Sequence, residues 1–73
     1  MILLDHKGHL VSDINLRELH HFATLILKLK PEWFQNRHIP HYDLTSTRKK
    51  QLAIQKGATL VTSKTLVRRA VKS

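Results

Sequence analysis

Residues 33–45, with the sequence WFQNRHIPHYDLT, concentrate most of the aromatic and histidine chemistry of this chain. The pattern His38-x-x-His41-x-Asp43 offers three donor atoms to a metal ion. This spacing straddles Pro40 and includes no cysteine or glutamate, and the chain has no helical His-x3-His pair of the kind typical of zinc sites. We therefore predict no metal ion and no other cofactor, and we assign the histidines to ordinary hydrogen bonding or solvation.

Catalytic groups are equally scarce. A two-metal nuclease needs several convergent carboxylates, but Glu18 and Glu32 are expected at helix starts and the other three acids are scattered. Nucleophilic catalysis needs a serine or cysteine beside a histidine. The expected positions of Ser12, Ser46 and Ser63 are helix caps or turns. Two glycines are too few for a phosphate-binding loop. We predict that the protein is not an enzyme.

Charge is distributed one-sidedly along the chain. All five acids lie in residues 1–43, where five bases balance them, whereas residues 44–73 hold eight bases and no acid. The whole formal net charge of +8 therefore belongs to the second segment. Such a field attracts polyanions or an acidic protein surface, although it does not determine the fold.

These observations favour a binding surface over a catalytic site for residues 33–45. We expect one of Trp33 and Phe34 to anchor the core and the other to lie nearer the surface; the alternative is that both fill the core. The loop residues should lie near the start of a basic helix and form one cationic, partly aromatic face with it. The predicted partner-binding residues are Trp33, Phe34, Arg37, His38, His41, Tyr42, Arg48, Lys49, Lys50, Lys56, Arg68 and Arg69.

The size of the chain indicates one domain over residues 1–73. A chain this short buries only roughly 60% of its unfolded surface, so its core is thin. The absence of cysteine excludes disulfides and a thiolate zinc site and favours the reducing cytoplasm. The N-terminus does not resemble a signal peptide, and the stretch FATLILKL is too short to span a membrane. We therefore predict a cytoplasmic protein with no membrane partner.

The first half of the chain predicts a hairpin and one long helix. Residues 2–4 and 9–11 read as two strands joined through Gly8. Residues 16–30 read as a helix that Asn15 caps, with Glu18 at the spacing of a capping box. Pro31 should end this helix. Its inward side is expected to carry Leu19, Phe22, Ala23 and Ile26.

The second half predicts shorter elements. Residues 31–35 suggest one extra helical turn, and residues 36–44 a loop or extended segment around Pro40. A second helix lies within residues 45–57, capped by Thr45 or Ser46. A strand at 58–62 and a third helix capped by Ser63 follow, with Leu66, Val67, Ala70 and Val71 inward. The expected fold is a small α/β (α+β) domain, with two to three helices on a two- to four-stranded sheet.

Three stretches, SDINLRELHHFA, EWFQNRHIPHYDLT and KKQLAIQKGATLVT, resemble a family of small bacterial and phage proteins known only as a domain of unknown function. Its members similarly run E-L-H-x-F-A, W-F-Q and P-H-Y-D-L, followed by a basic helix that ends in G-A. The resemblance covers about residues 9–65, and the N-terminus of this chain is shorter than usual. The family name carries no activity.

Length, basicity and this pattern are also similar to those of small phage regulators that bind the RNA polymerase of a bacterial host. That similarity implies a non-enzymatic protein that engages the β′ and β subunits, displaces the sigma factor and promotes anti-termination. The basic face would also lie near nascent RNA or DNA. The alternative is a nucleic-acid-binding module that acts alone through the basic C-terminal half.

Overall fold

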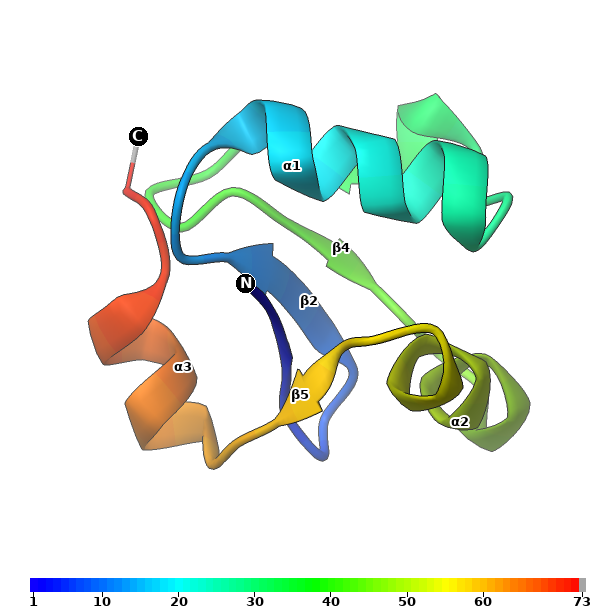
Figure 1. The fold of residues 1–73 in the computed structure, drawn as a ribbon. Helices are drawn as coiled ribbons and strands as arrows, with labels where there is room; N and C mark the ends of the chain where they lie inside the picture. The colour runs from blue at the N-terminus through cyan, green and yellow to red at the C-terminus, as the bar shows by residue number, and fades with distance from the viewer. Residues whose placement is uncertain (73) are drawn as a thin grey trace.

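The computed structural model describes residues 1–72 as a five-stranded mixed sheet with helices on both faces (Figure 1). The strand order is β3-β4-β2-β1-β5, with β5 parallel to β1 and the other neighbours antiparallel. The elements are β1 (Ile2–Leu4), β2 (His9–Ser12), α1 (Leu16–His20), the π-helical segment η1 (His21–Ile26), the 3₁₀ turn η2 (Pro31–Trp33), β3 (Phe34–Gln35), β4 (His41–Asp43), α2 (Thr47–Gln55), β5 (Thr59–Leu60) and α3 (Ser63–Arg69).

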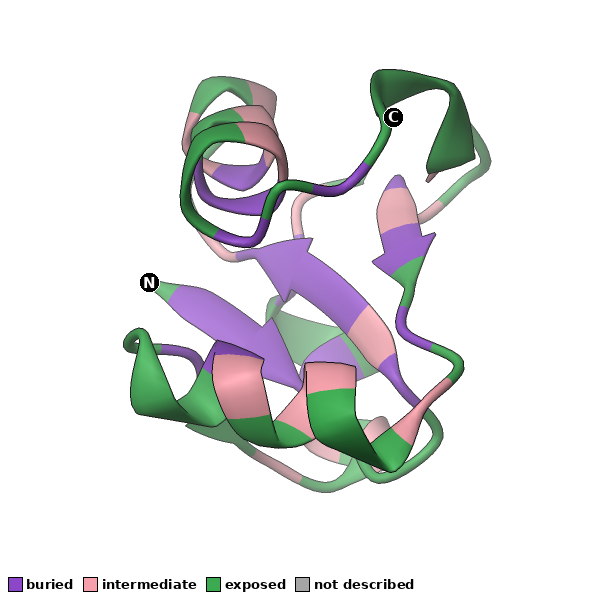
Figure 2. Ribbon diagram, turned by 90° about the vertical axis from the view of Figure 1, so that its right-hand side faces the viewer, coloured by how far each residue is buried: buried purple, intermediate pink, exposed green. Residues whose placement is uncertain are grey.

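Alternation along the strands divides the core between the two faces of the sheet. Leu4, Leu10 and Tyr42 point to the face that the first helix and α2 cover, while Leu3 and Val11 point to the face that α3 covers. Figure 2 shows the buried residues concentrated on the central strands. The first face holds the larger of the two hydrophobic clusters, and the second face the smaller.

The sheet has five strands in the described residues, whereas two to four were predicted. The additional strands are β3, which was predicted as part of a helical turn, and β4, which was predicted as a loop or extended segment; Phe34 of β3 lies opposite Tyr42 of β4. These strands are two and three residues long, which is too short for alternation to show in the sequence. Only their pairing with β2 and with each other identifies them as strands.

The first helix changes its hydrogen-bond pattern at His21. In η1 the bonds follow π geometry, and the Leu27 N–H donates to the Phe22 carbonyl oxygen at 3.0 Å. This wider turn shifts the later buried positions along by one residue. Ile26, predicted to face inward, is 37% exposed, and Leu27 is buried instead. The other three inward predictions, for Leu19, Phe22 and Ala23, are confirmed.

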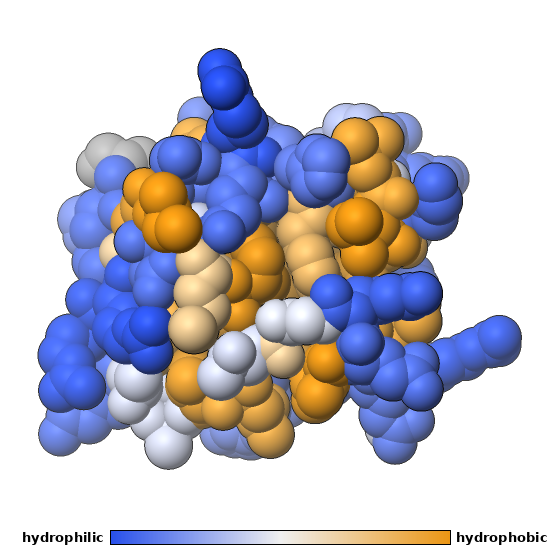
Figure 3. Space-filling view, viewed as in Figure 1, coloured by the Kyte–Doolittle hydropathy of each residue, from blue (hydrophilic) through white to orange (hydrophobic). Residues whose placement is uncertain are grey.

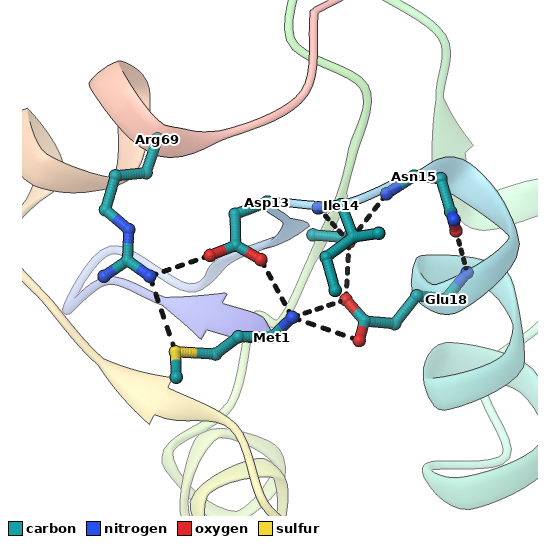
Figure 4. Close-up of polar contacts among 7 residues, drawn as sticks. Met1, Asp13, Ile14, Asn15, Glu18 and Arg69 are labelled. Carbon is teal, nitrogen blue, oxygen red and sulfur yellow. Dashed lines mark hydrogen bonds and ion pairs between the residues drawn. The ribbon is translucent and has the colours of Figure 1, made fainter.

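The start of the first helix is held by polar contacts that differ from the predicted capping box (Figure 4). Asn15 caps the helix as expected, accepting a 2.8 Å hydrogen bond from the Glu18 N–H. The Glu18 carboxylate, however, accepts a 2.6 Å bond from the Ser12 hydroxyl, which in turn accepts from the Asn15 N–H at 3.2 Å. Glu18 thus supports the cap through Ser12.

Neighbouring ion pairs link the first residue, Met1, to the end of α3 through Asp13 (Figure 4). The Met1 ammonium group lies 2.8 Å from an Asp13 carboxylate oxygen and 2.9 Å from a Glu18 carboxylate oxygen. Asp13 also accepts a 2.7 Å bond from Arg69 at the end of α3. Arg69 is therefore engaged in an intramolecular ion pair.

The two later helices match their predicted positions. Ser46 caps α2 by accepting a 3.1 Å bond from the Lys49 N–H. Thr62 caps α3, whereas Ser63 was predicted to do so. The predicted inward residues Leu66 and Ala70 are buried and Val71 is half-buried, but Val67 is 49% exposed. No helix in the described part of the chain is long and apolar enough to cross a membrane.

Candidate functional site

Three polar side chains meet on the sheet face that α3 partly covers. His41 and Asp43 are two residues apart on β4, so they point to the same face, opposite to the buried Tyr42 between them. The antiparallel pairing of β2 with β4 places His9 directly opposite Asp43. Two histidines and one carboxylate from distant parts of the sequence therefore share one surface of the sheet.

The distances within this group are close to those of a metal centre, although most are longer. The Asp43 Oδ1 atom lies 3.4 Å from His41 Nε2 and 3.9 Å from His9 Nε2, and the ligand atoms of all three residues lie within 4.8 Å of one another. Tetrahedral zinc with bonds of 2.0–2.1 Å separates its ligand atoms by about 3.3 Å. Small side-chain movements would bring the three atoms to that spacing.

A buried carboxylate orients the ring of His9. The Asp5 Oδ2 atom lies 2.9 Å from His9 Nδ1 and accepts a further 2.9 Å bond from the Ser63 hydroxyl. Burial raises the pKa of the Asp5 carboxyl, but the hydrogen bonds from His9 and Ser63 outweigh it and hold the pKa below its ordinary value. Because Asp5 is ionised and only accepts, Nδ1 of His9 carries the hydrogen. In the neutral ring, Nε2 then presents its lone pair to the cluster.

The ring of His41 is oriented in the same way by the backbone. Its Nδ1 atom lies 2.7 Å from the Ile39 carbonyl oxygen, which can only accept a hydrogen bond. Pro40 keeps Ile39 out of the helical region and so holds this carbonyl in place. Neutral His41 therefore also turns a bare Nε2 toward Asp43. With both rings neutral, three acceptor atoms would converge here, and outer hydrogen bonds of this kind orient the histidine ligands of metal sites.

A pocket adjoins the two histidines. It has a volume of about 290 Å³ and lies between the end of the β3–β4 connection and α3. Four of its lining residues are aliphatic, and Arg37 and His38 complete its wall beside the two histidines of the cluster. The lining residues are His9, Val11, Arg37, His38, Ile39, His41, Leu66 and Val67.

The structure separates the aromatic residues that were predicted to bind a partner. Trp33 is 39% exposed, with Lys49 Nζ 4.5 Å and Lys30 Nζ 5.7 Å from its ring centroid. Phe34 is half-buried and packs against the core beside Tyr42. Trp33 is therefore the residue nearer the surface and Phe34 the core anchor.

Tyr42 is not part of any surface. Its side chain is fully buried, and its hydroxyl oxygen lies 2.8 Å from His20 Nδ1. Tyr42, predicted to bind a partner, therefore offers no exposed side chain for that contact, because strand alternation turns it into the core while His41 and Asp43 turn to the other face.

The predicted basic residues are spread over several elements. Arg37 and His38 are exposed and line the pocket beside α3, whereas Arg48 and Lys56 are exposed on or just after α2. In the view of Figure 3, hydrophilic side chains lie on both sides of an apolar band. Three of the remaining bases, Lys49, Lys50 and Arg69, contact the Trp33 ring, the His6 carbonyl oxygen and the Asp13 carboxylate respectively, and Arg68 is exposed.

Sequence reasoning missed His9 as a member of the site. The sequence-based metal candidate combined His38, His41 and Asp43, but among the described residues the structure gathers His9 with the latter two. A signal was present in the two alternating patterns His9-x-Val11 and His41-x-Asp43, both typical of a strand face. The second was assigned to a loop or extended segment, so its pairing with the first was not predicted.

Comparison with known proteins gives one match. A family model described as Protein of unknown function (DUF4031) matches residues 5–73, which extends the predicted resemblance to both sides. No curated protein and no solved structure is significantly similar to the chain. The matched range includes Asp5, His9, His41 and Asp43.

Proposed function

The chain belongs to the DUF4031 family, and because that description carries no activity, we propose a function from the site itself. The domain binds one divalent transition-metal ion through His9 Nε2, His41 Nε2 and Asp43 Oδ1. The observation that carries this proposal is the convergence of three possible ligand atoms, with the two histidine rings already oriented by Asp5 and by the Ile39 carbonyl oxygen.

The ligand set favours zinc and leaves the ion incompletely coordinated. Imidazole nitrogen suits zinc and its neighbours in the transition series, whereas calcium and magnesium prefer sites built from oxygen ligands. Structural zinc sites have four protein ligands, whereas sites with three keep a position for water or another molecule. Three ligands beside a pocket therefore fit an ion that acts on, or binds, something further.

The competing explanation is a proton in place of the ion. A protonated Nε2 on either histidine would donate to Asp43 and remove the repulsion among the acceptors without any metal. The two explanations differ in stoichiometry and in their response to substitution, so direct metal binding distinguishes them.

The test is equilibrium dialysis of chelator-treated protein against zinc, with the bound metal measured by mass spectrometry. We expect one zinc per chain in the parent and substantially less in His9→Ala, His41→Ala and Asp43→Ala. His38→Ala is the matched control, since His38 lies outside the cluster and is exposed. Cobalt should produce visible d–d absorption in the parent that the three variants lack. Equal zinc retention by the parent and all three variants would contradict the proposal.

A second candidate function rests on the charge distribution. Residues 44–73 contain eight bases and no acid, and the pattern is similar to that of small phage regulators of host RNA polymerase. On this proposal the protein binds the β′ and β subunits, displaces the sigma factor and promotes anti-termination. Exposed Trp33, flanked by two lysines, would be its anchor at the interface.

Titration of RNA polymerase and of duplex DNA at two salt concentrations tests this second candidate. Specific polymerase binding should persist at moderate salt and weaken in Trp33→Ala. Binding to DNA through counterion release should instead fall steeply with salt and weaken when Arg48 and Lys56 are changed to glutamate. Tight DNA binding without polymerase binding would favour a nucleic-acid module, and binding to neither would exclude both.

A further inference from the structure

The pocket beside the proposed metal centre combines two kinds of wall. Val11, Ile39, Leu66 and Val67 supply aliphatic surface, and both ligand histidines form part of the boundary. A molecule in the pocket therefore lies against the two imidazoles that would hold the ion. Three protein ligands would leave a coordination position free, and a molecule beside His9 and His41 is close enough to their imidazoles to fill it.

The polar part of the wall includes one permanently cationic side chain, that of Arg37. Arg37 is exposed at the pocket, and the described residues show no ion pair to its guanidinium group. A guanidinium group binds two oxygens of a carboxylate or phosphate in parallel. With the ion at one end and Arg37 in the wall, an anionic head group would be attracted from two directions.

The volume restricts the size of the molecule. A pocket of about 290 Å³ lies at the lower limit of the roughly 300–1,000 Å³ typical of ligand sites. This volume suits a short chain better than a nucleotide or a long lipid. Val67 is 49% exposed at this pocket, an unpartnered apolar side chain that such a chain would cover.

From these features we infer that the site binds a small organic anion: the carboxylate or phosphate head meets the metal ion and Arg37, and a short alkyl tail lies against Val11, Ile39 and Val67. The inference rests on the proposed metal-binding function and names the class of molecule that completes it. Removing either the ion or the apolar wall should therefore weaken binding separately.

The experiment is a chemical-shift titration of the full chain, zinc-loaded and chelator-treated, with hexanoate. We expect at least tenfold tighter binding to the zinc-loaded form, with shifts at Val11 and Val67. Acetate, which lacks the tail, and hexan-1-ol, which lacks the charge, should each bind at least tenfold more weakly than hexanoate. Butyl phosphate is the arm that identifies the head group, and tight binding of either anion supports the inference.

Matched variants measure separately the contributions of the charged and the apolar parts of the pocket wall. Arg37→Gln should weaken hexanoate binding about tenfold, as expected for loss of a hydrogen bond to a charged group, whereas Arg48→Gln on α2 should not. Val67→Glu should abolish binding, whereas Ile54→Glu, at a similarly exposed position of α2, should not. Each of these four positions is exposed, so the fold should survive the changes.

The outcomes distinguish this inference from the function on which it rests. If zinc binds and hexan-1-ol competes as well as hexanoate, or no anion binds, the metal site stands and the organic-anion inference is wrong. If zinc itself does not bind, both are overturned.

Discussion

Zinc should stabilise this domain by an amount that follows from the position of its ligands. His9 lies on β2 and His41 and Asp43 on β4, so the unfolded chain holds no preformed site and the ion binds the native state alone. Free zinc at about 100 times its dissociation constant then adds about 2.7 kcal/mol to the free energy of unfolding. At roughly 4–8 °C per kcal/mol for a domain of this size, the melting temperature should rise by about 10–20 °C.

This shift is large relative to the whole stability of the domain. At roughly 0.05–0.15 kcal/mol per residue, a chain of 73 residues has a free energy of unfolding of about 4–11 kcal/mol. Asp43→Ala should remove the zinc-induced shift. It should leave the melting temperature of the chelator-treated protein nearly unchanged, because the Asp43 side chain is 47% exposed.

The assay is thermal unfolding followed by circular dichroism, with added zinc and with added chelator. His38→Ala, from the same loop but outside the cluster, should keep the full shift of the parent. An equal zinc-induced shift in Asp43→Ala and in the parent would refute the assigned site, as would a loss of the shift confined to His38→Ala.

Two further predictions concern the fold around the site. Leu27→Ala should lower the free energy of unfolding by about 2–5 kcal/mol, but Ile26→Ala by less than about 1 kcal/mol, because η1 turns Leu27 inward; equal losses in urea unfolding would contradict the π-helical register. Burial raises the pKa of Glu18, but hydrogen bonds from Ser12 and the Met1 ammonium outweigh it and hold the pKa below its ordinary value. A carboxylate whose pKa is lowered by folding stabilises the folded state at pH values above its unfolded-state pKa. This stabilisation is lost as the pH falls through its folded-state pKa. Glu18→Gln should therefore be less stable than the parent at pH 7 and lose less on acidification below about pH 4; urea melts at both pH values check this, and a steeper acid loss in the variant would contradict it.

Several features of this protein could be predicted from the sequence because they depend on neighbouring residues. The β1–β2 hairpin, the caps at Asn15 and Ser46, and the end of α2 at Gly57 follow from turn and capping preferences. Three of the four inward positions of the first helix follow from helical spacing, and the DUF4031 resemblance from local motifs. The one-sided charge is likewise a property of composition alone.

Features that depend on contacts between distant residues were decided only by the tertiary structure. The π-helical segment cannot be distinguished from an α-helix by the types of its residues, so the exchange of Ile26 for Leu27 in the core was not predicted. Tyr42 is buried because β4 is a strand that turns its side chain into the core. That strand is too short to identify in the sequence without its partner strands.

The candidate site shows the same division most clearly. Each histidine was visible in the sequence, but the meeting of His9 with His41 and Asp43 requires the antiparallel register of β2 and β4. Their ring orientations require Asp5 and the Ile39 carbonyl oxygen, one from the turn after β1 and the other from the residue before Pro40. Spacing along the chain determines which side chains share a face of one strand, whereas the register between strands decides which faces come together. In this protein the register of β2 against β4 brings together the three side chains of the candidate site.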